Sequence, residues 1–415
     1  MTALNRVSVI GLGYVGLPTA AMFASRKVNV IGVDVSQKAV DTINRGQIHI
    51  TEPDLDMVVQ AAVNQGYLTA TTTPQKADAF LIAVPTPLDA NCVPDLSFVE
   101  AAAKALAPVL EKGNIVILES TSPVTTTEQM AGWLAEARPD LSFPQTAGEA
   151  ADVNIAYCPE RVLPGKVMSE LIYNDRIIGG MSPTCSAKAV EVYKTFVEGE
   201  CLTTSTRIAE MCKLVENASR DAAIAFANEL SVICDKLDIN VWETIALANR
   251  HPRVNILQPG PGVGGHCIAV DPWFIAAAAP DEAQLIRTAR EVNDGKSDWV
   301  VDKVRAAISE LSLDRPLVVA CFGLAFKPDI DDLRESPALR VTHTLAQDPG
   351  LQVLAIEPNV DALPQSLNGK AELVSADEAF TRADVVVLLV DHKQFKAITP
   401  DGFAGPIVDT KGIWA

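Results

Sequence analysis

The chain has 415 residues, which is long for a single hydrophobic core and indicates two or three domains. Its composition, 48% hydrophobic and 21% charged, is ordinary for a soluble enzyme, and its formal net charge of -18 argues against nucleic acid or an anionic membrane as a partner. No apolar run reaches the length of a membrane span, and the N-terminus has no signal-peptide pattern, so we expect a cytoplasmic protein without a membrane partner.

Apolar strands alternate with helices in the first part of the chain. A strand at 7–10 leads into a glycine-rich loop, and a helix is predicted at 17–25. Further strands are predicted at 28–34, 79–84 and 115–119. Because these strands are apolar almost throughout and are separated by helices, they indicate a parallel, doubly wound sheet.

The pattern changes in the middle of the chain and then returns. Residues 205–250 and 281–311 are typical of long helices, and a loop rich in Pro and Gly lies between them at 258–265. Apolar strands then recur at 317–323, 352–357 and 383–390. We therefore predict an α/β protein with two Rossmann-like doubly wound domains joined by a central helical domain. The predicted boundaries are 1–204, 205–314 and 315–415.

A glycine pattern lies between the first strand and the first helix. Gly11, Gly13 and Gly16 form a G-x-G-x-x-G, whose glycines allow a tight turn and let a pyrophosphate approach the N-terminus of a helix. Asp34 ends the second strand, where a carboxylate suits a ribose diol and would repel a 2'-phosphate. The pattern predicts a dinucleotide site that favours NAD over NADP. The alternative is a glycine turn of purely structural use.

One cysteine stands out from the others. Cys267 follows Gly264 and Gly265 closely and precedes Asp271 by four residues. The remaining cysteines and the five histidines are scattered, with no C-x-x-C pair, so we expect no metal site. A thiol that can hold an acyl group, together with a hydride-accepting cofactor, would allow an alcohol to be oxidised past the aldehyde to the acid. A buried, inert thiol is the alternative.

Polar side chains share one face of the predicted helix around 210–220. Lys213, Asn217 and Arg220 lie at i, i+4 and i+7, so that Lys213 and Asn217 could hydrogen-bond a reacting oxyanion. A solvated helix face is the alternative. Basic residues that could hold a diphosphate, or be ordinary surface charges, occur further on at Arg250, His251, Arg253, Lys327 and Arg334.

Several short motifs occur in an order that is typical of one family. They are 11–18 (GLGYVGLP), 84–87 (VPTP), 119–123 (ESTSP), 158–161 (CPER), Lys213 with Asn217, 264–267 (GGHC) and 326–328 (FKP). Together they resemble the UDP-glucose/GDP-mannose dehydrogenase family of nucleotide-sugar 6-dehydrogenases over essentially the whole chain. Within it, residues 159–165 and 249–253 resemble the N-acetylhexosamine branch.

The resemblance implies an activity and roles for residues. The expected reaction is the NAD-dependent, four-electron oxidation of the C6 alcohol of UDP-N-acetyl-D-mannosamine to the uronate, for surface polysaccharide synthesis. Cys267 would be the nucleophile and Lys213 its catalytic partner, while Glu160, Thr121 and Asp271 would manage water and protons. The NAD contacts implied, besides the glycines, are Tyr14, Val15, Asp34, Thr86, Thr127 and Arg334. The UDP-sugar contacts implied are Arg161, Val162, Lys213, Asn217, Arg220, His251, Arg253, Gly264, Phe326 and Lys327.

Two further expectations concern assembly and one local turn. Residues 205–250 carry apolar side chains on more faces than one covering domain needs, for example Ile224 and Phe226, which predicts a homodimer. In the resembling family, the arginine at the position of Arg253 reaches the substrate of the neighbouring subunit. Thr125 stands where family members usually carry glycine, which puts the backbone near Thr127 in doubt.

Three alternatives to this function stay open at this point. One is the same chemistry on another UDP-hexose or UDP-N-acetylhexosamine, because no linear motif encodes the configuration of one sugar carbon. A second is a two-electron β-hydroxyacid-type dehydrogenase, which also carries Lys-x-x-x-Asn on a helix but needs neither Cys267 nor a second α/β domain. The third is a catalytically silent sugar-nucleotide sensor, against which Cys267, Lys213 and Asn217 argue.

Overall fold

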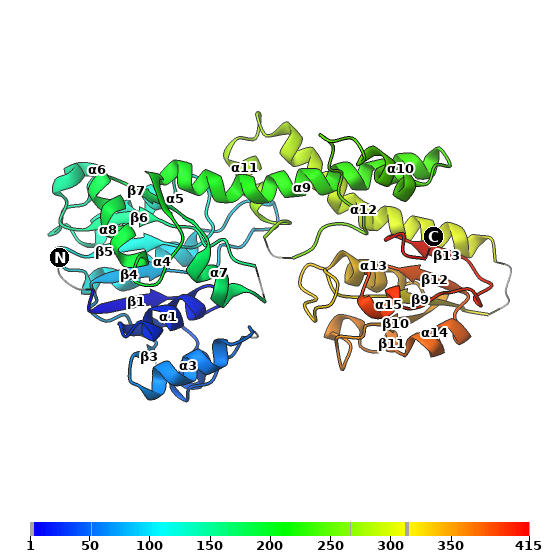
Figure 1. Ribbon diagram of the computed structural model, residues 1–415, viewed down its shortest axis with the longest axis horizontal. Coiled ribbons are helices and arrows are strands. Elements are labelled where there is room, and N and C mark those ends of the chain that lie inside the picture. The colour runs from blue at the N-terminus through cyan, green and yellow to red at the C-terminus, as the bar shows by residue number, and fades with distance from the viewer. Residues whose placement is uncertain (1–3, 51, 164, 266, 312–314, 415) are drawn as a thin grey trace. The chain divides into compact units, whose positions relative to one another are not determined.

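The computed structural model describes residues 4–50, 52–163, 165–265, 267–311 and 315–414, so Pro164 and His266 of the motifs above lie outside the described residues. The chain divides into two compact units, Met1–Val215 and Glu216–Ala415. The point of division falls within α9 (Thr206–Lys236), which Figure 1 shows as one continuous helix. The three domain boundaries given above stay a prediction.

Eight strands form a single sheet in the first unit (Figure 1, blue to green). In sheet order they are β3 (Leu68–Thr71), β2 (Asn29–Val33), β1 (Arg6–Ile10), β4 (Ala79–Ile82), β5 (Ile115–Leu118), β6 (Asn154–Tyr157), β7 (Arg176–Gly180) and β8 (Cys201–Ser205). The chain order reverses between β1 and β4. In open α/β sheets ligands bind at the carboxyl ends of the strands beside such a reversal.

Helices cover both faces of this sheet. One hydrophobic cluster joins the sheet to α1 (Gly16–Ser25), α2 (Gln37–Asn44), α3 (Leu55–Asn64), α7 (Val167–Tyr173) and α8 (Pro183–Tyr193). A second cluster joins it to α4 (Ser97–Leu106) and α5 (Thr126–Ala137). Every residue of β4 and β5 is buried, as expected for apolar strands covered on both sides.

The last two strands, β7 and β8, depart from the wholly parallel sheet expected from the sequence. β7 runs antiparallel to β6, pairing Gly180 with Ala156, and β8 is parallel to β7. The chain leaves β6 at its carboxyl end, passes through α7 and enters β7 from that same end. This return places Arg176, the first residue of β7, beside the carboxyl end of β6, where Glu160 follows.

The middle of the chain is helical, as predicted. After α9 come α10 (Val241–Ala248), α11 (Asp271–Ala278) and α12 (Gln284–Ser309). Asn240 begins α10 by accepting hydrogen bonds from the backbone N–H groups of Trp242 and Glu243, an N-cap arrangement. Among the described residues, no helix is both long enough and apolar enough to cross a membrane.

The second unit contains a five-stranded parallel sheet (Figure 1, yellow to red). Its strands, in sheet order, are β11 (Ala371–Leu373), β10 (Leu351–Ile356), β9 (Leu317–Phe322), β12 (Val385–Leu388) and β13 (Ile407–Asp409). On one face lie α12 and α13 (Pro337–Leu345), and on the other α14 (Ala376–Arg382) and α15 (Lys393–Lys396). The order repeats that of the first sheet around β1, so the prediction of two Rossmann-like units is confirmed.

Candidate active site

The glycine loop of the first unit has no room for a side chain at two of its three glycines. Gly11 has a φ of +91°, and a Cβ atom there would lie 2.5 Å from the carbonyl oxygen of Ala83. A Cβ atom on Gly16 would lie 1.8 Å from the carbonyl oxygen of Gly11. Gly13, by contrast, has nothing within 4 Å of its Cβ position. The loop therefore packs against β4 and leaves open space at Gly13 by the start of α1, where a pyrophosphate would approach.

Asp34 lies at the carboxyl end of β2 and is half-buried. One carboxylate oxygen accepts the Leu12 backbone N–H at 3.0 Å, and the other accepts the Ser36 N–H at 2.8 Å. Tyr14 and Val15 complete the loop, and Tyr14 is 48% exposed. These residues fit a dinucleotide with its pyrophosphate at α1 and its ribose at Asp34.

Two threonines tie together the loops that follow β4 and β5. The hydroxyl of Thr86 donates a hydrogen bond of 2.5 Å to the carbonyl oxygen of Thr121. Thr86 is 8% exposed and Thr121 is half-buried. The structure thus brings one predicted NAD contact and one predicted proton-handling residue together at the carboxyl ends of neighbouring strands.

Glu210, a residue that the sequence interpretation missed, holds the N-terminus of α5. Its carboxylate accepts the backbone N–H of Thr125 at 2.7 Å and both the N–H and the hydroxyl of Thr127 at 2.8 and 2.6 Å. Burial raises the pKa of Glu210, although the hydrogen bonds from Thr127 and Thr125 oppose it. Thr127 is fully buried with its hydroxyl on Glu210, and its contact with NAD stays a prediction.

Thr125 has a φ of +84°, in the left-handed region that glycine favours. Thr125 stands where the resembling family usually carries glycine, which adopts this conformation without strain. Here a β-branched residue adopts it, which costs strain. The N–H bond to Glu210 fixes the turn in spite of that strain.

In the second unit, two predicted catalytic residues meet. The amide Nδ2 of Asn217 on α9 donates a hydrogen bond of 2.5 Å to Asp271, the first residue of α11, and both side chains are buried. The backbone N–H of Asp271 in turn donates to the carbonyl oxygen of Cys267 at 2.9 Å. Cys267 itself is exposed, one turn ahead of α11. Asp271 thus connects the cysteine turn to the Asn217 amide.

A buried polar network fixes the glycine-rich loop that leads to Cys267. The N–H of Gly260 donates to the side-chain oxygen of Asn228 at 2.9 Å, and Asn228 donates to Asn293 at 2.9 Å. Asn293 donates to Asp221 at 2.8 Å, and Arg290 pairs with the same carboxylate at 2.6 Å. These four side chains are at most 1% exposed, and none of them was singled out from the sequence. They show how α9 and α12 determine the path of the loop.

The same loop packs against the segment that follows β9. A Cβ atom on Gly264 would lie 2.6 Å from Cβ of Phe326, and one on Gly265 would lie 3.0 Å from its ring. The structure therefore brings together two predicted substrate contacts, Gly264 and Phe326. Lys327, the next residue, is exposed.

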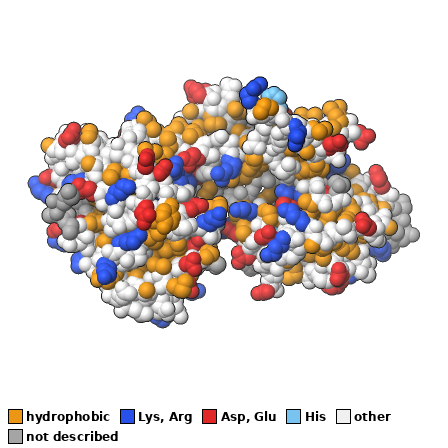
Figure 2. All heavy atoms as spheres, viewed as in Figure 1, with side chains coloured by type: hydrophobic (Ala, Val, Ile, Leu, Met, Phe, Trp, Pro, Cys, Tyr) orange, Lys and Arg blue, Asp and Glu red, His pale blue; other side chains and the backbone are white. Residues whose placement is uncertain are grey.

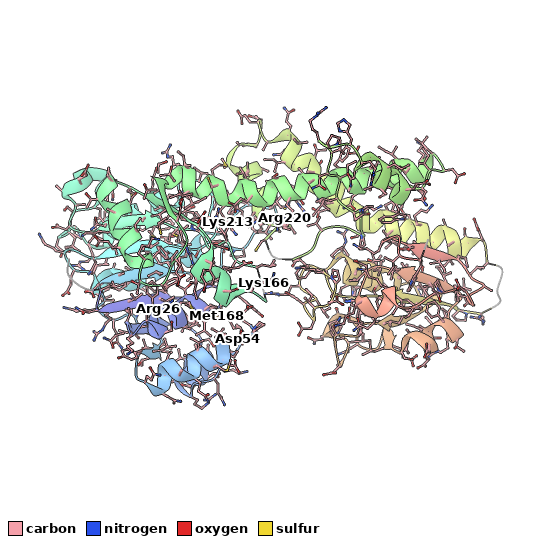
Figure 3. All side chains as sticks on the ribbon, viewed as in Figure 1. Arg26, Asp54, Lys166, Met168, Lys213 and Arg220 are labelled. Atoms are coloured by element: carbon pink, nitrogen blue, oxygen red, sulfur yellow. The ribbon has the colours of Figure 1, made fainter. Side chains whose placement is uncertain are left out.

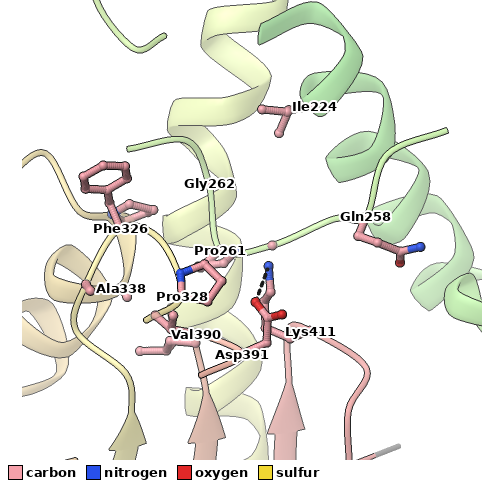
Figure 4. Close-up of a pocket in the computed structure, with 14 residues that line it drawn as sticks. Ile224, Gln258, Pro261, Gly262, Phe326, Pro328, Ala338, Val390, Asp391 and Lys411 are labelled. Carbon is pink, nitrogen blue, oxygen red and sulfur yellow. Dashed lines mark ion pairs between the residues drawn. The ribbon is translucent and has the colours of Figure 1, made fainter. Parts of the chain in front are cut away.

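A pocket opens between this loop and the carboxyl ends of β9 and β12 (Figure 4). Its lining includes Gln258, Pro261, Phe326, Asp391 and Lys411. The Lys411 amine lies 3.4 Å from the Asp391 carboxylate, which also pairs with Lys396 at 2.6 Å. Asp391 and Lys411 were not found from the sequence, because they follow β12 and β13 and meet only through the fold.

The loop after β6 carries Glu160, Arg161 and Val162. Glu160 is 8% exposed; one of its oxygens accepts the Arg161 N–H at 2.7 Å and the other lies 2.7 Å from Arg176. Further along, buried Glu52 accepts the N–H groups of Gly165 and Val167 at 3.0 and 2.9 Å. The loop is thus held at both ends.

The other predicted site residues are mostly at the surface. Lys213 is half-buried and Arg220 is exposed, and Figure 3 shows both along α9. Arg334 is exposed and pairs with Asp332 at 2.7 Å, and His251 and Arg253 are exposed after α10. Lys213 and Cys267 belong to different compact units, so their pairing stays a prediction.

Three family models match consecutive parts of the chain. They describe the NAD binding domain, the central domain and the UDP binding domain of the UDP-glucose/GDP-mannose dehydrogenase family, over residues 5–197, 207–295 and 320–415.

Individual relatives match over nearly the full length. A UDP-N-acetyl-D-mannosamine dehydrogenase of Yersinia pestis is 67% identical, covering 99% of this chain and 100% of that protein. An NDP-N-acetyl-D-galactosaminuronic acid dehydrogenase of Ralstonia nicotianae is 61% identical over 99% of this chain and 96% of its own length. Among solved structures, the UDP-N-acetyl-mannosamine dehydrogenase of Staphylococcus aureus matches with a TM-score of 0.83 and 42% identity, over 99% of this chain and 95% of that one.

Proposed function

Because the chain belongs to the UDP-glucose/GDP-mannose dehydrogenase family, we propose that it oxidises the C6 alcohol of UDP-N-acetyl-D-mannosamine to the carboxylate. It is an NAD-dependent UDP-sugar dehydrogenase. The choice of sugar is supported by the UDP-N-acetyl-D-mannosamine dehydrogenase of Yersinia pestis, which is similar to this chain over nearly its full length. The Ralstonia nicotianae relative favours a second candidate, the same oxidation of an N-acetylgalactosamine nucleotide.

The observation that carries the four-electron chemistry is an exposed Cys267 whose turn is tied through Asp271 to the amide of Asn217. NAD bound at the glycine loop would accept a hydride from C6 in each of the two oxidations. The Cys267 thiolate would attack the C6 aldehyde, forming a C–S bond and a thiohemiacetal. Asn217 and Lys213 would donate hydrogen bonds to its oxygen. The second oxidation converts this carbon to a thioester.

Hydrolysis of the thioester needs a base. Water would attack the acyl carbon, the C–S bond would break, and the thiolate of Cys267 would return. Glu160 is the candidate to take the proton of that water, with Thr121 or Asp271 in support. Glu160 lies 2.7 Å from the Arg176 guanidinium, an ion pair that fixes the position of its carboxyl group.

We propose that UDP occupies the pocket lined by Phe326 and Lys411. Lys411 brings positive charge to it within a chain of net charge -18, which an anionic diphosphate requires. The neighbouring Gly264 lets the loop pack closely against Phe326, one of the lining residues.

We also propose that the protein is a homodimer in which Arg253 serves the partner's substrate. Support comes from exposed apolar side chains in the single chain: Phe226 of α9 at 57%, Leu237 just after α9 at 60% and Leu247 of α10 at 65%. Figure 2 shows hydrophobic side chains at the surface over α10. A second copy would bury this area.

An absorbance assay of NADH formation with a panel of UDP-sugars tests the function. We expect the highest kcat/KM with UDP-N-acetyl-D-mannosamine, compared with the gluco and galacto N-acetyl sugars and with UDP-glucose. A clear preference for the galacto sugar would support the second candidate. No NADH from any sugar, by folded protein that binds NAD, would contradict both.

A further inference from the structure

Five buried polar side chains, Glu160 among them, form a cluster in the first unit. They are Glu119 after β5, Cys158 and Glu160 after β6, Arg176 of β7 and Tyr193 of α8, and each is at most 8% exposed. The hydroxyl of Tyr193 donates a hydrogen bond of 2.6 Å to Glu119, and the Arg176 guanidinium lies 5.0 Å from the centre of the Tyr193 ring. The same guanidinium lies 2.7 Å from Glu160. Tyr193 and Arg176 thus link the two carboxyl groups.

The charges of this cluster do not balance when both carboxyl groups are ionised. Arg176 brings one positive charge, and an uncompensated carboxylate at this depth would be costly. Cys158 and Tyr193 stay neutral at neutral pH, because burial raises the pKa of Cys158 to about 12 and that of Tyr193 well above its ordinary value. We therefore expect the two carboxyl groups of the cluster to hold one proton between them.

The hydrogen bonds place that proton on Glu119. Glu160 accepts the N–H of Arg161 at 2.7 Å and forms an ion pair with Arg176. Glu119 accepts the Tyr193 hydroxyl through one oxygen, and its other oxygen has no hydrogen-bond partner among the described residues. Burial raises the pKa of Glu119 to about 7, against the lowering by Arg176 and Tyr193. Glu119 would therefore gain and lose this proton near neutral pH.

Arg176 contacts Glu160 and lies over the ring of Tyr193, whose hydroxyl is hydrogen-bonded to Glu119. Its 2.7 Å contact with Glu160 is an ion pair without hydrogen-bond alignment, since neither terminal nitrogen makes an aligned hydrogen bond within the described part of the chain. The titratable and charged groups that face Glu119 are Cys158, Glu160, Arg176 and Tyr193. Of the two charged neighbours of Glu119, Arg176 lowers its pKa and Glu160 raises it.

We propose that Glu119 sets the basicity of Glu160 by competing with it for Arg176. While Glu119 is protonated, the positive charge of Arg176 is balanced by the Glu160 carboxylate alone, and Glu160 stays a weak base. When Glu119 loses its proton, the two carboxylates share one guanidinium, and Glu160 gains affinity for the proton of the attacking water. Glu119 is in this account a positioning residue that acts through Arg176, and the inference rests on the proposed role of Glu160 in hydrolysis.

The test compares pH profiles of kcat for NADH formation across neutral pH. In the wild type we expect an increase on the order of threefold to tenfold as the pH rises through about 7, the pH at which Glu119 loses its proton. Glu119→Gln keeps the shape and an oxygen for Tyr193 but cannot ionise, so this increase should vanish. Tyr193→Phe removes a hydrogen bond that lowers the pKa of Glu119, so the midpoint should move to higher pH.

Cys158→Ala is the matched control, because it disturbs packing in the same cluster without removing a group that titrates near neutral pH. It should leave the midpoint in place. Infrared difference spectra on the protein without substrate give a second readout: the wild type should lose a protonated-carboxyl band near pH 7, and Glu119→Gln should lack it. An active wild type whose pH profile survives Glu119→Gln, or variants that lose activity equally at every pH, would overturn the inference alone. A wild type without activity on any UDP-sugar would instead overturn the proposed function.

Discussion

The carboxylate of Asp34 accepts a hydrogen bond from the backbone N–H of Leu12 at 3.0 Å, so the acid that would bind the ribose also holds the glycine loop. The second unit repeats this arrangement. There Glu357, after β10, accepts the N–H groups of Leu324 and Ala325 at 2.8 and 3.0 Å. In both sheets, the acid at the end of the second strand therefore holds a loop by hydrogen bonds. A test of cofactor preference at Asp34 has to separate this structural role from the role in binding the ribose.

Asp34→Asn and Asp34→Ala make that separation. Asn removes the negative charge but can still accept the Leu12 N–H, so we expect the preference for NAD over NADP to fall on the order of tenfold with little change in stability. Ala also removes the loop hydrogen bonds and should cost about 2 kcal/mol of stability and weaken NAD binding. kcat/KM with each cofactor and thermal unfolding measure both effects. An unchanged cofactor ratio in Asp34→Asn would mean that Asp34 only supports the loop.

Thr125→Gly should stabilise the protein. The left-handed φ of +84° strains a β-branched residue, and relief of that strain outweighs the greater entropy of glycine in the unfolded chain, leaving about 0.5–1 kcal/mol. Thr126→Gly, one residue later at the start of α5, should instead destabilise by about 1 kcal/mol. Urea unfolding curves of both variants check this. A Thr125→Gly variant less stable than the wild type would show that the turn is not strained.

Lys411→Met should raise KM for the UDP-sugar on the order of tenfold with a smaller change in kcat, because a cation facing a diphosphate is worth about 1–3 kcal/mol. Lys396→Met is its control. Lys396 pairs with the same carboxylate, Asp391, but is not among the residues that line the pocket, so KM should barely change. Equal effects of the two substitutions would indicate that only Asp391 matters and that the diphosphate binds elsewhere.

The parts of the fold that depend on local sequence patterns could be predicted from the sequence. The glycine loop, Asp34 at the end of β2 and the return of apolar strands after Pro316 are all readable because spacing and burial are encoded within short segments. The strands β7 and β8 were not predicted, and an apolar pattern would not have shown that they run against β6, because it is the same whichever way a strand runs.

The hydrogen-bond partners of the site residues could not be predicted from the sequence either. Glu210 caps α5 from more than 80 residues away, and Asn228 reaches the loop at Gly260 across 32 residues. No spacing rule links such pairs, because the tertiary fold alone brings them together. Asn217 was recognised from its helix face, but its hydrogen bond to Asp271 became visible only with the structure.

The shared active site can be tested by mixing two inactive variants, Cys267→Ser and Arg253→Ala. If Arg253 acts on the partner's substrate, a mixed dimer contains one site with both native residues and regains part of the wild-type kcat. If Arg253 serves its own chain, every site in the mixture lacks one group and no activity returns. Mixtures of each variant with itself are the controls, and native mass spectrometry verifies subunit exchange. Absence of rescue despite exchange would refute the sharing of the site.

The most direct measurement of the central claim is the number of NADH molecules formed per UDP-sugar consumed. A reaction that passes through a thioester on Cys267 yields two NADH and a uronate, and Cys267→Ser should form no uronate while still binding NAD, because serine lacks a comparable nucleophile at neutral pH. The account predicts this ratio of two with UDP-N-acetyl-D-mannosamine. A ratio of one with an aldehyde or ketone as product, or full turnover by Cys267→Ser, would contradict it.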